Sequence, residues 1–123
     1  MADHALFIGW GEIISGREQH ATRVFGETMA YFGRLQQQGD IESVEPFFLE
    51  AHGGDLNGFF LVRGEVNDLS RVRNSEEFDN VILRATMVVQ RMGVVSATTG
   101  QELERQIGNF GTIAAEFSSS GNS

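Results

Sequence analysis

The feature that most constrains the fold is a set of short segments that are apolar at every position. They are residues 5–8 (ALFI), 47–49 (FFL) and 59–62 (FFLV). Their aromatic and branched side chains favour strands. Successive side chains of a strand point to opposite faces, so these strands place apolar groups on both faces of a sheet. Both faces must then be covered, and helices supplied by the same chain are the first candidates.

Capping signals and apolar spacing predict the order of the elements. Ser15 and Glu18 match a capping box for a helix, Thr99 and Glu102 match a second one, and Gly39 is a typical C-terminal stop. Between these signals, apolar residues recur at three- and four-residue spacing or in short runs. We therefore expect strand 5–13, helix 16–38, strands 41–51 and 58–66 around a turn at 52–55, a helical region over 67–93 broken near 73–74, strand 94–98 and a terminal helix.

This order, βαββαβ plus one helix, predicts an α+β fold. Right-handed crossovers and one hairpin arrange it as a ferredoxin-like four-stranded antiparallel sheet with two helices on one face. Pro46 places its strand at a sheet edge, because proline cannot donate to a ladder. We expect a single domain over residues 1–117 and a disordered Ser-rich tail over 118–123.

Two helices leave the second face of the sheet uncovered. An apolar face of that size exceeds the roughly 300–600 Å² patch found on monomers. We therefore predict a homodimer in which the sheets of two copies pack face to face.

The order of elements, the two-faced strands and the passage Gly64…Asn74-Ser75-Glu76-Glu77-Phe78 resemble the dimeric α/β-barrel superfamily. That superfamily includes antibiotic-biosynthesis monooxygenase-like and YCII-related domains. The resemblance covers roughly residues 5 to 100 and implies a dimer with a ligand cleft between sheet and helices. The His/Asp pair of YCII-like proteins and the Asn, Trp and Tyr positions of the monooxygenases have no residue-by-residue match here. The resemblance therefore implies no specific activity.

Composition excludes several classes of chemistry. The net charge is −8, all nine cations are Arg, and the chain has neither Lys nor Cys. These absences remove thiolate nucleophiles, Cys-based metal sites, Schiff bases and the usual P-loop. The acidic balance argues against a nucleic-acid partner. Without a leader-like segment or a long apolar run, we expect a cytoplasmic protein with no membrane contact, no cofactor and no metal.

Strand parity suggests a ligand-binding cluster on the face away from the helices. If Phe60 and Val62 meet the helices, Arg63 and Glu65 point the other way, and we expect Trp10 and Glu12 to join them. Such a cluster could bind the polar head of a ligand whose apolar body contacts phenylalanines. The alternative is a set of ordinary ion pairs at the dimer interface.

Three further residues have both a functional and a structural interpretation. His20 could serve as a general base facing the cleft, or it could lie on the helix surface. Tyr31 could donate a phenolic proton to a ligand, or it could be a core residue whose hydroxyl reaches the surface. His52 could bind metal with its acidic neighbours, but a Gly-rich turn holds ligands poorly, so a solvated turn is preferred.

Three functions are compatible with these residues. The preferred hypothesis is a dimeric barrel protein that binds a small, partly apolar molecule. The second is a cofactor-independent monooxygenase or isomerase acting on an aromatic or polyketide-like substrate, in which His20 or Glu12 moves a proton and Trp10 and Tyr31 position the ligand. The third is a structural subunit whose sheet face exists only for assembly.

Overall fold

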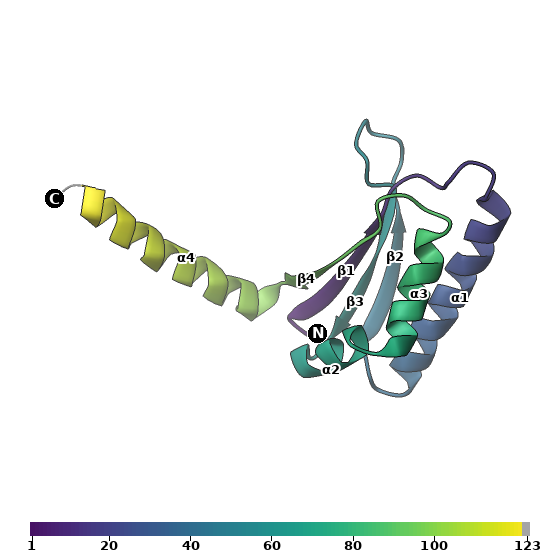
Figure 1. Cartoon of the computed structure of the whole chain (residues 1–123). Coiled ribbons are helices and arrows are strands. Elements are labelled where there is room, and N and C mark those ends of the chain that lie inside the picture. The colour runs from purple at the N-terminus through teal and green to yellow at the C-terminus, as the bar shows by residue number, and fades with distance from the viewer. Residues whose placement is uncertain (122–123) are drawn as a thin grey trace.

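The computed structural model describes residues 1–121 and contains a four-stranded antiparallel sheet with strand order β2-β3-β1-β4 (Figure 1). Along the chain the elements are β1 (His4–Trp10), α1 (Glu18–Gln37), β2 (Ser43–Phe48), β3 (Gly58–Gly64), α2 (Val66–Arg73), α3 (Glu76–Thr86), β4 (Gly93–Thr98) and α4 (Gly100–Gly121). The predicted α+β, ferredoxin-like order is confirmed, with the expected break between α2 and α3.

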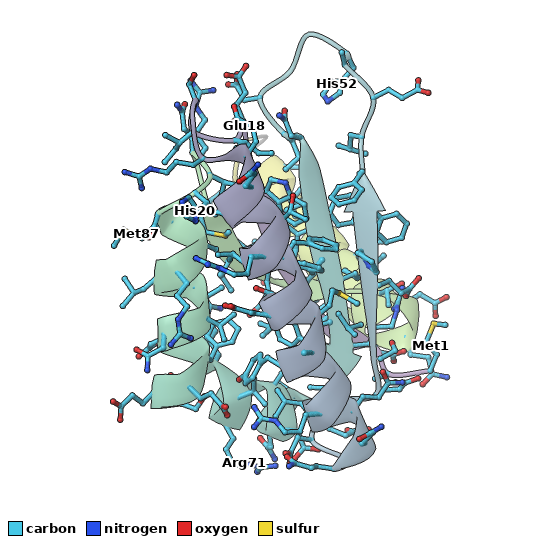
Figure 2. All side chains as sticks on the ribbon, turned by 90° about the vertical axis from the view of Figure 1, so that its right-hand side faces the viewer. Met1, Glu18, His20, His52, Arg71 and Met87 are labelled. Carbon is cyan, nitrogen blue, oxygen red and sulfur yellow. The ribbon has the colours of Figure 1, made fainter. Side chains whose placement is uncertain are left out.

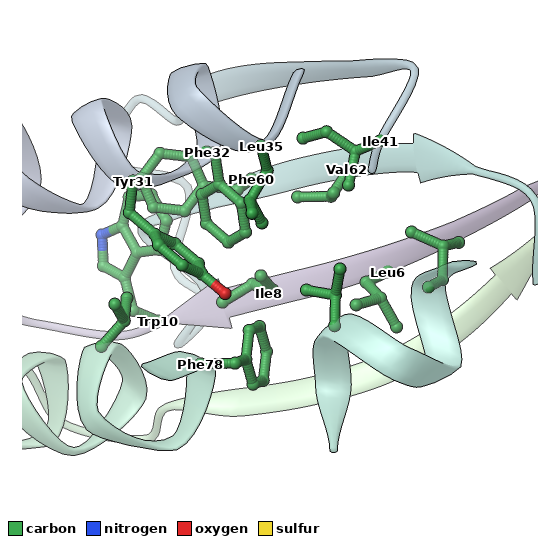
Figure 3. Packing of buried hydrophobic residues seen from close by; sticks show 13 residues of the cluster. Leu6, Ile8, Trp10, Tyr31, Phe32, Leu35, Ile41, Phe60, Val62 and Phe78 are labelled. Carbon is green, nitrogen blue, oxygen red and sulfur yellow. The ribbon is translucent and has the colours of Figure 1, made fainter. Parts of the chain in front are cut away.

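Helices α1 and α3 cover one face of the sheet, and the opposite face carries no helix (Figure 1). The core lies between sheet and helices, where Ile8, Phe32 and Val62 are almost fully buried (Figure 3). Register explains which side chains enter it. Phe60 lies opposite Ile8 and Val62 lies opposite Leu6, and directly opposed residues of an antiparallel pair share a face.

The ends of the helices follow the sequence signals in part. Ser75 caps α3 by accepting a hydrogen bond from the Phe78 amide at 3.1 Å. Gly39 follows α1 with φ of +82°, as predicted. The capping box at Ser15 is wrong: the N-cap is Arg17, without a side-chain cap. Residues 14–17 form a turn instead, and the Arg17 guanidinium donates to the carbonyl of Met87.

The first three strands are shorter than predicted, and β4 begins one residue earlier than predicted. β1 ends at Trp10 because the chain then turns toward the segment after α3, where the Gly11 amide donates to the Gln90 carbonyl at 2.8 Å. That segment is not helical, since α3 ends at Thr86 rather than near residue 93. β2 is an edge strand, as Pro46 predicts.

Helix α4 leaves the domain on the side opposite to α1 and α3 (Figure 1). Seen from the helical side, α4 lies behind the sheet (Figure 2). The tail predicted to be disordered, 118–123, overlaps the end of α4, and its last two residues lie outside those described. Within residues 1–121, no helix has both the length and the hydropathy needed to cross a bilayer.

Candidate functional site

A cleft of about 330 Å³ lies between the first half of α1, the segment that follows α3 and one end of the sheet. We call it the aromatic cleft. It has three kinds of lining residue: aromatic, aliphatic and two threonines. They are Trp10, Phe25, Phe48, Phe60, Ile13, Ala21, Val24, Ala85, Val88, Val89, Met92, Thr22 and Thr28.

Four aromatic rings form one wall of the aromatic cleft. The centroids of Trp10 and Phe60 are 5.1 Å apart, and those of Phe25 and Phe60 are 5.4 Å apart. Phe48 continues the wall at 5.1 Å from Phe25 and is 71% exposed, so it lies at the mouth. Tilted and offset contacts at these distances are favourable for aromatic rings. The wall can therefore accept a further flat ring.

The position of Trp10 depends on a glycine in the neighbouring strand. A Cβ added to Gly58 would lie 2.5 Å from Cζ2 of Trp10 and 2.7 Å from the Phe47 carbonyl oxygen. No side chain fits there, so the indole packs directly on the backbone of β3. This contact holds the Cε2–Cζ2 edge of the indole against the sheet, and Trp10 also lines the cleft.

The polar groups of the aromatic cleft are few and uncharged. The hydroxyls of Thr22 and Thr28 donate to α1 carbonyls at 3.1 and 2.8 Å. The indole Nε1 of Trp10 has no hydrogen-bond partner among residues 1–121, and it is not sealed from solvent. This N–H is therefore open to water or to another acceptor.

None of the lining residues of the aromatic cleft is ionisable. A carboxylate or phosphate placed in such a cleft would lose its hydration without gaining a counter-charge. The arrangement therefore suits a neutral, mostly apolar molecule, and the lining itself offers no general acid or base.

The predicted cluster of Trp10, Glu12, Arg63 and Glu65 is not formed, because the parity assigned to the first strand was wrong. Trp10 pairs with Gly58 and faces the helices, whereas Arg63 pairs with Ala5 on the open face. Both parities of β1 are apolar, and the larger set, Leu6, Ile8 and Trp10, packs beneath the helices.

The charged members of that cluster lie apart. Glu12 is exposed beyond β1, where its carbonyl accepts the Gln90 amide at 2.8 Å. Glu65 is exposed as the N-cap of α2. Arg63 forms an ion pair on the open face, with its Nε 3.5 Å from Oε1 of Glu45. The ion-pair alternative thus holds for Arg63, with Glu45 as the partner.

His20 lies on the exposed surface of α1 (Figure 2). Its Nδ1 accepts a hydrogen bond from the Arg23 guanidinium at 3.3 Å. The ring lines a surface groove that also includes Arg17, Arg84 and Met87. It does not line the aromatic cleft, and this position matches the helix-surface alternative.

Tyr31 belongs to the core and is 6% exposed (Figure 3). It lines a groove on the outer side of α1 and α3, where the Arg34 guanidinium carbon lies 5.5 Å above its ring. Burial raises the pKa of the phenol, and a hydrogen bond with Ser75 opposes part of that shift. Tyr31 and Trp10 therefore line different cavities.

His52 interacts with its own loop. Its Nε2 donates to the Leu56 carbonyl at 3.0 Å, and its Nδ1 accepts the Gly54 amide at 3.3 Å. These bonds use both ring nitrogens and correspond to the preferred interpretation of a turn residue.

Sequence reasoning missed most of the lining of the aromatic cleft, including Phe25, Thr28 and Met92. Phe25 and Thr28 lie on the side of α1 that packs toward the core, and Thr28 is buried. The available signal was the small Ala21 one turn earlier, which leaves space between α1 and the sheet. Met92 could not be found this way, because it lies in an irregular segment.

No protein-family model and no curated protein sequence matches the chain. Solved structures do match. A dabb family protein with a ferredoxin-like fold from Mesorhizobium loti superposes with a TM-score of 0.63 at 7% identity, over 80% of this chain and 98% of that one. SnoaB, a cofactor-independent oxygenase from Streptomyces nogalater, gives 0.54 at 17% identity, over 81% and 96%.

A third structure is a dimeric protein of unknown function with a ferredoxin-like fold from Bacteroides fragilis. It gives a TM-score of 0.56 at 10% identity, over 78% of this chain and 96% of that one. At these identities the likeness is one of fold. The ferredoxin-like fold that the predicted resemblance implies is confirmed.

We predict that the Tyr31 phenol titrates above its ordinary pKa of 10.0 in the folded protein, because burial disfavours the phenolate. The folded chain then retains a proton that the unfolded chain releases. The free energy of unfolding should therefore fall as pH rises from about 10 toward the folded pKa. Tyr31 is the only tyrosine, so tyrosinate absorbance measures it directly, with the urea-unfolded chain as the reference. An equal or lower midpoint in the folded protein would contradict this assignment.

Proposed function

We propose that this chain is a homodimeric α/β-barrel protein that binds a small, neutral, mostly apolar molecule in the aromatic cleft. The observation that supports this most directly is the uncharged lining, which combines an aromatic wall that includes the Trp10 indole with two threonines. Ligand sites are usually apolar cavities with a few orienting polar groups.

The dimensions of the cleft indicate the class of ligand. About 330 Å³ lies near the lower end of the range of ligand pockets, roughly 300–1,000 Å³. A fused two-ring aromatic molecule is of a suitable size, and the wall of Trp10, Phe25 and Phe60 offers rings against which it can pack. A ketone or quinone oxygen on that molecule could accept from Trp10 Nε1.

Filling the cleft should prevent binding. We predict that Val24→Phe, which projects a ring into the aromatic cleft, weakens binding of a neutral naphthyl ketone by at least about tenfold, since roughly 1.4 kcal/mol of lost contact corresponds to that factor. The measurement is quenching of Trp10 fluorescence, because Trp10 is the only tryptophan.

The matched control for this experiment is Val66→Phe. Val66 is 51% exposed at the start of α2 and does not line the cleft. The Val66→Phe variant should bind the ketone with wild-type affinity. Equal affinities in Val24→Phe and Val66→Phe would show that the probe binds elsewhere.

The second candidate is a cofactor-independent oxygenase or isomerase. The shared fold of SnoaB, itself a cofactor-independent oxygenase, favours it at the level of architecture. Such chemistry needs a group that moves a proton, and the predicted groups, His20 and Glu12, do not line the aromatic cleft. For this reason we place binding ahead of catalysis.

We predict that His20→Ala and Glu12→Gln leave ligand affinity within about twofold of the wild type, because surface substitutions away from a site have small effects. Oxygen uptake with a hydroxylated two- or three-ring aromatic substrate should show no turnover in any of the three proteins. Turnover in the wild type that either substitution abolishes would favour the enzyme instead.

The homodimer is supported by the open face of the sheet. Phe59 stacks between Phe7 and Phe47, with centroids 4.8 and 4.7 Å away. Val95 on the same face is 55% exposed. On the same face Arg63 and Glu45 form an ion pair, so that each charge has a counter-charge within the chain. A second copy of the same face would cover this surface without leaving an unpaired charge.

A charge within the aromatic cluster of the open face should prevent assembly. We predict that Phe59→Glu sediments near the 13.6 kDa monomer mass, whereas the wild type sediments at about twice that value, because burying an unpaired carboxylate is costly. The control is Leu83→Glu on the outer side of α3, where Leu83 is 55% exposed. A wild-type monomer at micromolar concentration would defeat the dimer proposal.

A further inference from the structure

Helix α4 has an apolar stripe, and no other helix or strand among residues 1–121 packs along it. Leu103, Ile107, Phe110, Ala114 and Phe117 repeat at alternating four- and three-residue spacing, which places them on one side of a helix. We call them the α4 stripe. The side chains from Leu103 to Phe117 are exposed, with Phe110 and Phe117 each at 75%. Such a continuous exposed stripe marks an interaction site.

Contacts at the start of α4 fix the direction in which the helix leaves the domain. Gly100 has φ of +60°, and a Cβ at this position would collide with the carboxylate of Asp3. The Thr99 amide donates to the Asp3 carbonyl at 2.9 Å, and the Thr98 hydroxyl donates to Gln106 at 2.8 Å. These contacts direct α4 away from the body of the chain, so that the α4 stripe cannot fold back onto its own sheet.

We propose that the α4 stripe packs against the second copy of the chain, the one that covers the open face of the sheet. This inference rests on the proposed homodimer. Figures 1 and 2 both place α4 on the open-face side of the sheet. A copy seated on that face therefore lies alongside α4, and the two α4 helices of the dimer would each contact the opposite subunit.

The area needed for a stable dimer also supports a second copy of the chain as the partner of the α4 stripe. Strands of six or seven residues, at about 3.3 Å per residue and about 4.8 Å between strands, give the open face a projected area of about 400 Å². A standard interface buries roughly 800 Å² per partner. A 22-residue helix is about 33 Å long and about 10 Å wide, which adds about 330 Å².

The charges of α4 argue against a membrane surface as the alternative partner of the α4 stripe. Helices that lie on anionic bilayers are rich in Lys and Arg. α4 has Arg105 as its cation and carries Glu102, Glu104 and Glu116. Two internal glycines, Gly108 and Gly111, also lower the intrinsic stability of the helix, so that packing against a partner must stabilise it.

The test compares two double variants of the full chain with equal added charge and equal spacing. Ile107→Glu/Phe110→Glu places two carboxylates on the α4 stripe, and Asn109→Glu/Thr112→Glu places two on the opposite side of the helix. Sedimentation over a concentration series should give a dimer dissociation constant at least about 100-fold higher for the stripe variant, as expected for loss of a central interface contact. The control should stay within about threefold of the wild type.

Hydrogen exchange supplies an independent measurement. The amides of α4 should be protected above the dimer dissociation constant and exchange rapidly below it. An unchanged Trp10 emission spectrum would show that the stripe variant keeps its folded body, because α4 is separate from the core.

The outcomes separate this inference from the homodimer itself. If Phe59→Glu dissociates the dimer while the stripe variant retains wild-type affinity, the sheet interface stands and the α4 proposal is overturned. If the dimer survives Phe59→Glu and is lost only in the stripe variant, α4 assembles the copies and the sheet interface is wrong. A monomeric wild type, or stripe-dependent binding to vesicles of phosphatidylserine and phosphatidylcholine without dimerisation, overturns the α4 proposal.

Discussion

The structure depends first on the antiparallel register between β1 and β3. Ile8 opposite Phe60 and Leu6 opposite Val62 assign one parity of both strands to the helices. The other parity, which includes Phe59, is then left on the open face. A slip of one residue would exchange the two sets completely. The core, the aromatic cleft and the proposed interface all follow from this single alignment.

The two faces of the sheet differ in the chemistry that they offer. On the helical side, the cleft offers apolar contact from an uncharged lining that includes the Trp10 indole. On the open side, the ring of Phe59 lies within an apolar surface, and the charge of Arg63 is neutralised by Glu45. Neither surface offers an unpaired charge. The net charge of −8 therefore resides on the outer surface, where it favours solubility of the assembled protein.

Most of the fold could be predicted from the sequence, because periodicity, capping residues and Pro46 are local signals. The parity of β1 could not, because both of its faces are apolar and only the pairing with Phe60 and Val62 distinguishes them. For the same reason Trp10 was placed with Arg63, on the wrong side of the sheet. The cleft itself is a gap in packing between α1 and an irregular segment, and no spacing in the sequence encodes a gap.

Phe59 and Phe60 are neighbours in the chain and face opposite sides of β3. Phe60 lies in the wall of the aromatic cleft, while Phe59 lies on the open face, in the proposed subunit contact. A single peptide group thus separates the proposed ligand site from the proposed contact. If ligand binding and dimer formation are thermodynamically linked, β3 can couple them directly. A displacement of this strand would move Phe59 and Phe60 together and so would change both surfaces.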